Sequence, residues 1–224
     1  IVGGMISVFT PSHNPKYLDE ALASMLKQTY EDWEWIVLLN NGAEWSAEDE
    51  RVKIYHSANT TGYVGSLKSD AVSLCKGDIF VELDHDDYLA SNALELVAEA
   101  ARNNPSCGFY FSDTLHVNED GTPQDSAYSP FFGWKYYSYT DENGVEFNVP
   151  DTFPAHPHNV NLIWYAPNHI RAFRRDAYYL AGGYDTSLEV LDDQRLMCSL
   201  FRETDFFKIP QPVYYQRAHG ENTQ

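Results

Sequence analysis

The sequence predicts an α/β protein with a mainly parallel sheet flanked by helices, followed by a loop-rich second half. Up to residue 113, short apolar runs that suit buried strands alternate with segments of helical spacing. Such alternation indicates βαβ units, which assemble into parallel sheets. Residues 114–170 then show no helical period and are rich in Tyr, Phe, Trp, Pro and Asn. Turn signals at Asp120-Gly121 and Asn143-Gly144 interrupt this segment.

Each strand expected in the first half is a short, mostly apolar run bounded by turn-forming residues. These strands are residues 6–9, 35–39, 52–55, 79–83 and 108–111. The first helix is expected to begin with Asn14 as its N-cap and Pro15 at its first position. Further helices are expected within residues 62–74, over residues 93–101, just before Gly182-Gly183, and around the apolar positions Leu196, Met197, Leu200 and Phe201.

The 224 residues contain no internal repeat and no low-complexity linker. We therefore expect one domain, residues 1–224, with two halves at residues 1–113 and 114–224. In the second half, seven of the twelve residues from Tyr128 to Tyr139 are aromatic. Such a stretch forms either a loop-rich core or a platform for a flat ligand such as a sugar.

The chain is strongly acidic, with 15 Lys and Arg against 33 Asp and Glu and a formal net charge of −18. This charge disfavours binding to nucleic acid and to anionic membranes. An anionic substrate would need a positive mediator, for which a divalent cation is the obvious candidate.

Several features predict a location in the cytoplasm. No apolar run approaches the length of a transmembrane segment, and no signal peptide opens the chain. The cysteines Cys75, Cys107 and Cys198 are far apart and lack CxxC spacing, which indicates a reducing compartment. The chain stops soon after His219, so we expect one module of a longer polypeptide.

The acidic turn Asp84-His85-Asp86-Asp87 directly follows a strand that is expected to be buried. Three carboxylates so close together cannot all stay ionised without a cation. A hard divalent ion with oxygen ligands satisfies them and can also hold phosphate oxygens. An acidic surface turn that caps the next helix accounts for the same residues, so spacing alone leaves both interpretations open.

A second acidic pair, Asp192-Asp193, opens the helix that follows Gly182-Gly183. One of the two carboxylates can serve as a general base on a rigid element. Acidic residues are also favourable at any helix N-terminus, which is the simpler explanation for this pair alone. His219, close to the chain end, is either an ordinary surface histidine or a late metal ligand.

The loops at residues 10–14, 40–42 and 84–87 follow strands of the expected parallel sheet. Ligands bind beyond the carboxyl ends of such strands, so these loops should converge on a site. Gly62 allows a backbone to approach a ligand closely, and Lys68 can meet a phosphate. No Walker A, GxGxxG or GxSxG motif is present.

Taken in order, these segments resemble the inverting glycosyltransferases of family 2, which have the GT-A (Rossmann-like) fold. The resemblance covers nearly the whole chain and is specific because six motifs occur in the right order. They are the opening strand and loop at residues 6–14, the S-x-x-x-Q-T-Y exit of the first helix within residues 22–34, Asp84-His85-Asp86-Asp87 as the DxD metal motif, Gly182-Gly183-Tyr184-Asp185 as the glycine-rich loop, Leu191-Asp192-Asp193 as the xED motif, and His219 as the C-terminal metal ligand.

The resemblance implies a metal-dependent enzyme that moves a sugar from a nucleoside-diphosphate sugar to a hydroxyl of a glycan or other acceptor, with inversion. Residues 1–113 would bind the nucleotide sugar, and residues 114–224 would bind the acceptor and carry catalysis. Asp86 would coordinate Mn²⁺ or Mg²⁺ on the donor diphosphate, Asp84 would contact the ribose or the metal, and His219 would complete the metal shell.

The resemblance also implies roles for the remaining site residues. Thr10, Pro11 and Asn14 would line the nucleotide pocket, with Lys68 near the phosphates. Asp193 would be the base that deprotonates the acceptor hydroxyl. The aromatic segment 128–139 and the loop 150–170 fall where the family places its acceptor-binding region.

Two positions depart from the family pattern. Asn40 follows the second strand where the family usually has an aspartate that reads the base or ribose. An asparagine can still hydrogen-bond a uracil-like edge, which favours a UDP-sugar. Asp192 replaces the usual glutamate of the xED motif, so the choice between Asp192 and Asp193 as the base stays open.

Two other functions fit parts of the sequence. A sugar nucleotidyltransferase would share the parallel sheet and the metal, but it needs a glycine-rich basic loop where this chain has residues 10–14. A non-enzymatic carbohydrate-binding module would use the aromatic stretch for stacking and the acidic turn for structural Ca²⁺. The βαβ first half argues against such a module by fold-level analogy.

Overall fold

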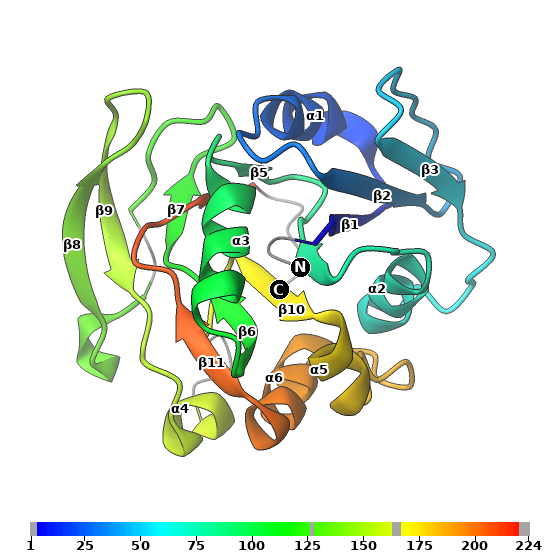
Figure 1. Ribbon diagram of the computed structural model, residues 1–224. Coiled ribbons are helices and arrows are strands. Elements are labelled where there is room, and N and C mark those ends of the chain that lie inside the picture. The colour runs from blue at the N-terminus through cyan, green and yellow to red at the C-terminus, as the bar shows by residue number, and fades with distance from the viewer. Residues whose placement is uncertain (1–3, 126–127, 163–166, 220–224) are drawn as a thin grey trace.

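The computed structural model describes residues 4–125, 128–162 and 167–219. Its central sheet consists of β1 (Ile6–Ser12), β2 (Trp33–Leu39), β3 (Val52–His56), β4 (Ile79–Glu82), β6 (Cys107–Phe111), β10 (Arg171–Arg174) and β11 (Asp205–Lys208). The strand order is β11-β6-β10-β4-β1-β2-β3 (Figure 1). Within the described residues all of these strands run parallel except β10, which lies antiparallel between β4 and β6.

Helices cover both faces of this sheet. One face packs against α1 (Leu18–Leu26) and α3 (Ala93–Asn103), and the other against α2 (Val64–Ser73), α4 (Pro157–Leu162), α5 (Arg175–Leu180) and α6 (Asp192–Glu203). Strand β2 shows why, because its side chains alternate between faces: Trp35 and Val37 pack with α1 and α3, and Ile36 packs with α2. A strand buried on both faces reads as a continuous apolar run, as expected from the sequence.

The expected strands and helices of the first half are confirmed. The first helix starts with a 3₁₀ turn, η1 (Pro15–Tyr17), and the Oδ1 atom of Asn14 accepts a hydrogen bond from the backbone N–H of Lys16 at 3.1 Å. This is the N-cap that the Asn14-Pro15 pair predicts. In the second half, the strand β10 and the helices α5 and α6 lie where regularity returns in the sequence.

The second half holds more regular structure than its pattern indicates. A hairpin of β8 (Lys135–Thr140) and β9 (Glu146–Asp151) turns at Gly144, which has a φ of +78°. A small sheet joins β5 (Tyr88–Leu89), β12 (Tyr214–Arg217) and β7 (Thr114–Val117). The short η2 (Pro130–Phe132) precedes β8. Strands β5, β7 and β12 cannot be predicted from a local pattern, because they are short and pair with segments distant in sequence. Figure 1 shows the hairpin on the side of the molecule opposite β3.

None of the described helices has both the length and the apolar character needed to cross a membrane.

Candidate active site

The loops that follow β1, β2 and β4 meet at one edge of the sheet, as expected. The backbone N–H of Asn40 donates to the carbonyl of Ser12 at 2.9 Å. The hydroxyl of Ser12 lies 3.0 Å from Nδ1 of His85, in the acidic turn. The hydroxyl of Thr10 donates to the carbonyl of Leu83 at 2.6 Å. The carboxyl ends of three neighbouring parallel strands therefore surround a common region.

The three carboxylates of the acidic turn have different environments. Asp84 has a third of its side chain exposed and Asp86 about an eighth, at 33% and 13%. Asp87 is buried and accepts hydrogen bonds from the hydroxyl of Tyr214 at 2.7 Å and from the backbone N–H of Arg217 at 2.8 Å. Burial and the neighbouring carboxylates raise the pKa of Asp87 well above its usual value. Asp87 thus ties β12 to the turn, and Asp84 and Asp86 remain available to a ligand.

His219 reaches the acidic turn from the far end of the chain. Its Nε2 atom lies 2.8 Å from the Oδ2 atom of Asp86, and its ring lies 5.5 Å from that of Tyr17. The buried guanidinium of Arg217 holds this segment in place by donating to the carbonyl of Asp86 at 3.0 Å. It also donates to the Glu119 carbonyl and the Glu20 carboxylate.

These residues fit a hard or borderline divalent cation. The Asp86–His219 pair offers a carboxylate oxygen and an imidazole nitrogen side by side, and Asp84 offers a second carboxylate from the same turn. Carboxylate oxygens suit Mg²⁺ and Mn²⁺, and imidazole is tolerated by the softer of the two. The partial exposure of Asp84 leaves room for ligand oxygens to complete the shell.

Next to the turn, Glu82 is buried at the end of β4 with its side chain 1% exposed. Its carboxylate lies 2.7 Å from Nζ of Lys68 and 3.0 Å from Nε2 of His169, and it accepts a hydrogen bond from the hydroxyl of Tyr184 at 2.5 Å. Burial acts to raise the pKa of Glu82, but Lys68, His169 and Arg171 outweigh it and hold this pKa well below its usual value.

Glu82, Asp84 and His169 form a second group whose ligand atoms lie within 4.8 Å of one another. Among the described residues this is the group of three whose ligand atoms come so close, and Asp86 with His219 is a separate pair. Lys68 already places its ammonium 2.7 Å from Glu82 and 3.9 Å from Asp84, and the Arg171 guanidinium lies 3.6 Å from Glu82. A divalent cation would have to displace or withstand these two buried positive charges.

The two carboxylates at the N-terminus of α6 also differ. Asp193 lies 3.1 Å from the guanidinium of Arg171. Burial opposes ionisation, but Arg171 and Lys68 prevail and lower the pKa of Asp193. The pKa of Asp192 is raised, chiefly by burial, and its Oδ2 atom has no hydrogen-bond partner among the described residues. Asp193 is therefore the carboxylate that stays ionised most readily.

The remaining predicted site residues lie at varying depths. Thr10 is fully buried, and its hydroxyl also accepts a hydrogen bond from the indole of Trp35 at 2.8 Å. Pro11, Asn14 and Asn40 are half-buried. Gly62 is exposed in the left-handed region, at a φ of +71°, with open space beside it. In the segment predicted to bind the acceptor, residues 163–166 lie outside the described residues.

Sequence reasoning missed Glu82, His169 and Arg171. Glu82 carries the one available signal, because it is the single charged residue in the apolar run at residues 79–83. An isolated charge in a buried strand needs a partner. The sequence does not reveal that its partners come from β10 and the segment before it.

A family model for glycosyl transferase family 2 matches residues 7–178. The chain is 25% identical over 229 residues to a chondroitin synthase of Escherichia coli, covering 98% of this chain and 30% of that protein. It is 24% identical over 235 residues to the uncharacterized glycosyltransferase EpsJ of Bacillus subtilis, covering 98% of this chain and 62% of that protein. The chain thus spans only part of the length of these relatives.

Solved structures share the fold. The crystal structure of S. aureus TarS 1-349 in complex with UDP-GlcNAc superposes with a TM-score of 0.69 at 16% sequence identity. The match covers 97% of this chain and 60% of that one. At this identity the likeness supports the architecture alone. From the family match over most of its length, together with this architecture, the chain belongs to glycosyltransferase family 2 and has the GT-A fold.

Proposed function

We propose that this chain transfers a sugar from a nucleoside-diphosphate sugar to a hydroxyl of a glycan, with a divalent metal and with inversion at the anomeric carbon. The observation that carries the proposal is the 2.8 Å contact between His219 and Asp86, which are 133 positions apart in the sequence. Two residues that separate motifs predict as metal ligands thus come together beside the donor-side loops. Residues 1–113 bind the donor in this proposal, and residues 114–224 carry the acceptor and the base.

Asp86, His219 and Asp84 would hold Mn²⁺ or Mg²⁺ at the edge of the sheet. Such an ion, when bound, neutralises the donor diphosphate and stabilises it as a leaving group. The net charge of −18 makes this neutralisation necessary, because an acidic surface repels a nucleotide. Lys68 is already paired with Glu82 and lies 3.9 Å from Asp84, so its contribution is to offset their negative charge beside the phosphates.

Pro11, Asn14, Asn40 and Gly62 line the donor in this proposal, and the fully buried Thr10 supports its loop from beneath. The loops after β1, β2 and β4 converge through the contacts of Ser12 with Asn40 and His85. A UDP-sugar is the favoured donor. The amide of Asn40 can pair with a uracil edge, and the related fold of TarS has been seen with UDP-GlcNAc.

Asp193 is the proposed base. Its ionised carboxylate accepts the proton of the acceptor hydroxyl as that oxygen bonds to the anomeric carbon. The bond from the anomeric carbon to the diphosphate breaks on the opposite side, so the configuration inverts. The transition state is oxocarbenium-like, and a carboxylate with a low pKa is therefore an adequate base. Arg171 orients Asp193 from 3.1 Å away. Asp192 is the second candidate for the same role.

The test is calorimetric titration of UDP, GDP, dTDP and CDP into the protein, first with Mn²⁺ and then with EDTA. We expect one nucleotide, UDP, to bind only in the presence of metal. Asp86→Ala should weaken this binding by about 100-fold or more, because a direct ligand matters at least as much as an outer-shell group. Metal-independent binding, or no binding of any nucleotide by the folded protein, would contradict the proposal.

A further inference from the structure

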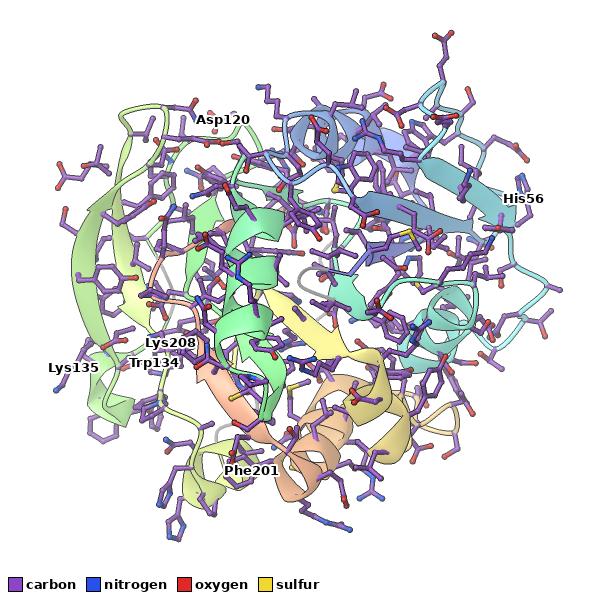
Figure 2. All side chains as sticks on the ribbon, in the orientation of Figure 1. His56, Asp120, Trp134, Lys135, Phe201 and Lys208 are labelled. Atoms are coloured by element: carbon purple, nitrogen blue, oxygen red, sulfur yellow. The ribbon has the colours of Figure 1, made fainter. Side chains whose placement is uncertain are left out.

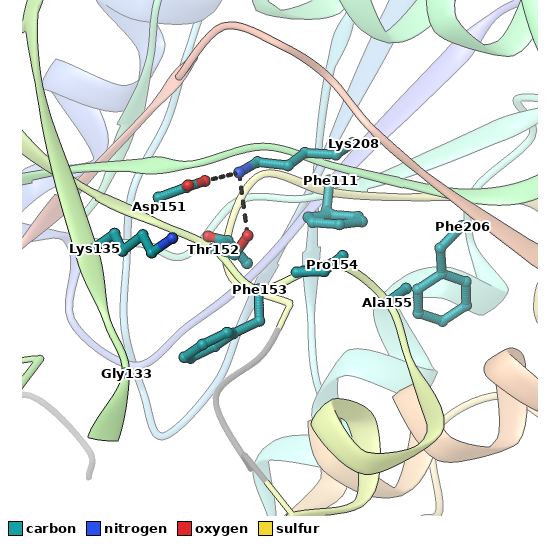
Figure 3. Close-up of a pocket in the computed structure, with 10 residues that line it drawn as sticks. All are labelled: Phe111, Gly133, Lys135, Asp151, Thr152, Phe153, Pro154, Ala155, Phe206 and Lys208. Atoms are coloured by element: carbon teal, nitrogen blue, oxygen red, sulfur yellow. Dashed lines mark hydrogen bonds and ion pairs between the residues drawn. The ribbon is translucent and has the colours of Figure 1, made fainter. Parts of the chain in front are cut away.

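A cavity of about 610 Å³ opens beside the β8–β9 hairpin (Figure 3). This volume suits a small-molecule ligand, since such sites measure roughly 300–1,000 Å³. We call it the 151–155 pocket, after the loop that forms one wall. Its lining is Phe111, Gly133, Lys135, Asp151, Thr152, Phe153, Pro154, Ala155, Phe206 and Lys208.

The lining combines aromatic faces with paired polar groups. Figure 3 shows the rings of Phe153, Phe111 and Phe206 around one part of the pocket. At the other part, the ammonium of Lys208 lies 2.6 Å from the carboxylate of Asp151 and donates to the carbonyl of Thr152 at 3.2 Å. A pyranose has an apolar C–H face and a polar rim of hydroxyls, and this combination matches both halves of the pocket.

The polar side of the pocket, formed by Asp151, Thr152 and Lys208, is held in place by hydrogen bonds and ion pairs. Asp113, 4% exposed, lies behind it, and one of its oxygens accepts from the backbone N–H of Thr152 at 2.8 Å and from Lys208 at 2.9 Å. The other oxygen accepts from the hydroxyl of Tyr137 at 2.7 Å. On the aromatic side, the ring of Phe153 packs against buried Trp134 at 4.6 Å. Figure 2 shows Trp134, Lys135 and Lys208 gathered on this side of the molecule.

The pocket and the candidate active site both lie at the edge of the central sheet formed by the carboxyl ends of its parallel strands. Phe111 and Lys208 are the last residues of β6 and β11, just as Glu82 is the last residue of β4. Strand β10 lies between β4 and β6, so two strand spacings separate their ends. At about 4.8 Å per spacing, the backbone of Phe111 at the pocket lies about 10 Å from that of Glu82, which directly precedes the acidic turn. One monosaccharide does not bridge that distance.

We propose that the acceptor is an oligosaccharide or longer glycan, and that the 151–155 pocket binds a sugar unit remote from the one whose hydroxyl reacts. This inference rests on the proposed function, because it needs the reaction to occur at the acidic turn. The pocket supplies affinity for the acceptor chain and takes no part in donor binding.

The test begins with an array of defined neutral and acidic glycans, from monosaccharides to hexasaccharides, probed with the protein carrying UDP and Mn²⁺. The tightest ligand is then titrated in shortened forms against the wild type, Phe153→Ala, Phe153→Tyr and Tyr179→Ala. Tyr179 is a 56% exposed aromatic residue on α5, outside the pocket lining and outside the segments assigned to the acceptor, and is the control. Thermal melting verifies that each variant is folded.

We expect the longer glycans to bind more tightly than the monosaccharide. Phe153→Ala should remove this gain in affinity and weaken binding of the long ligand about tenfold, as the loss of a stacking face implies. Phe153→Tyr should restore this gain in affinity, and Tyr179→Ala should match the wild type. Absence of any glycan binding, or a chain-length gain unchanged in Phe153→Ala, would overturn the proposal. UDP affinity is measured in parallel, so a failed donor site is recognised separately.

Discussion

The side chain of Glu82 is almost fully buried, and the groups that bind its carboxylate also hold the neighbouring site residues in position. Lys68, His169 and Tyr184 lie within hydrogen-bonding distance, and Arg171 lies between Glu82 and Asp193. A buried charge left without partners would cost several kcal/mol, so the network holds its members in one arrangement. That arrangement aims the guanidinium of Arg171 at Asp193 and fixes the proposed base.

The role of Asp193 is tested by Asp193→Asn, which keeps the shape and removes the basic oxygen. We expect transfer to fall by about 10²–10⁴-fold, the usual contribution of a positioned general base. Metal-dependent UDP binding should persist, because Asp193 is not among the proposed metal ligands. Initial-rate assays and calorimetry measure the two quantities. Asp192→Asn is the matched control, and a larger loss of transfer in that variant would reverse the assignment.

The lowered pKa of Asp193 also predicts how stability depends on pH. A carboxyl with a folded-state pKa below its unfolded value of about 3.9 stabilises the protein above that pH, and this contribution is lost as pH falls through the folded pKa. The wild type should therefore unfold with a higher free energy than Asp193→Asn near neutral pH, and the difference should shrink below about pH 4. Urea titrations across this range measure it.

At the scale of elements, the candidate base depends on how closely α2 and α6 approach. A Cβ added at Gly65 of α2 would lie 2.5 Å from the Cβ of Asp192 and 3.2 Å from the carbonyl of Asp185. The glycine is therefore needed for space, since its φ is not in the left-handed region. The N-terminus of α6, which carries both carboxylates, is seated directly on this gap.

Gly65→Ala should push the two helices apart. We expect it to lower the free energy of unfolding by about 1–3 kcal/mol, as overpacking does. It should also reduce transfer more than it reduces UDP binding, because α6 carries the proposed base. Denaturant melts and paired rate and binding assays measure these effects. Ser73→Ala, on the exposed face of the same helix, should stay within about 0.5 kcal/mol of wild type.

Strand β12 delivers His219 to the acidic turn, and Arg217 fastens its end. The guanidinium is 2% exposed and lies over the ring of Tyr17 at 4.6 Å. Arg217→Met should therefore destabilise the protein by about 1–3 kcal/mol, because it removes the hydrogen bonds to the carbonyls of Asp86 and Glu119. It should also weaken Mn²⁺ binding in the presence of UDP.

Manganese titration followed by electron paramagnetic resonance checks this second effect. Lys16→Ala breaks an exposed ion pair with Glu119 in the same neighbourhood and should cost at most about 1 kcal/mol. If Arg217→Met, like the control Lys16→Ala, bound Mn²⁺ as tightly as the wild type does, the end of β12 would have no part in the metal site.

The sequence predicts those elements whose evidence is local. The apolar runs at β1, β2 and β4 and the Asn14 cap each lie within a few residues, and the structure confirms them. The small sheet of β5, β12 and β7 and the Glu82 network depend on partners far away. Glu82 and His169, for example, are 87 positions apart. No local pattern records such a pairing, so Glu82, His169 and Arg171 become visible only in the fold.

At the scale of the whole molecule, the net charge of −18 opposes compactness through self-repulsion. Salt should therefore stabilise the protein. Raising NaCl from about 10 mM to about 150 mM shortens the screening length from about 30 Å to about 8 Å, and we expect a higher melting temperature. Scanning calorimetry at the two concentrations measures it. A lower melting temperature at high salt would mean that attractive surface pairs outweigh the repulsion.

The antiparallel strand β10 also sets an order of events during synthesis. Strands β4 and β6 do not pair with each other, and each is completed in the sheet only by β10. While the ribosome makes residues 112–170, both strands keep an unpaired inner edge, which is where nascent chains aggregate. The sheet can close only after β10 has left the ribosome and fills the gap between β4 and β6.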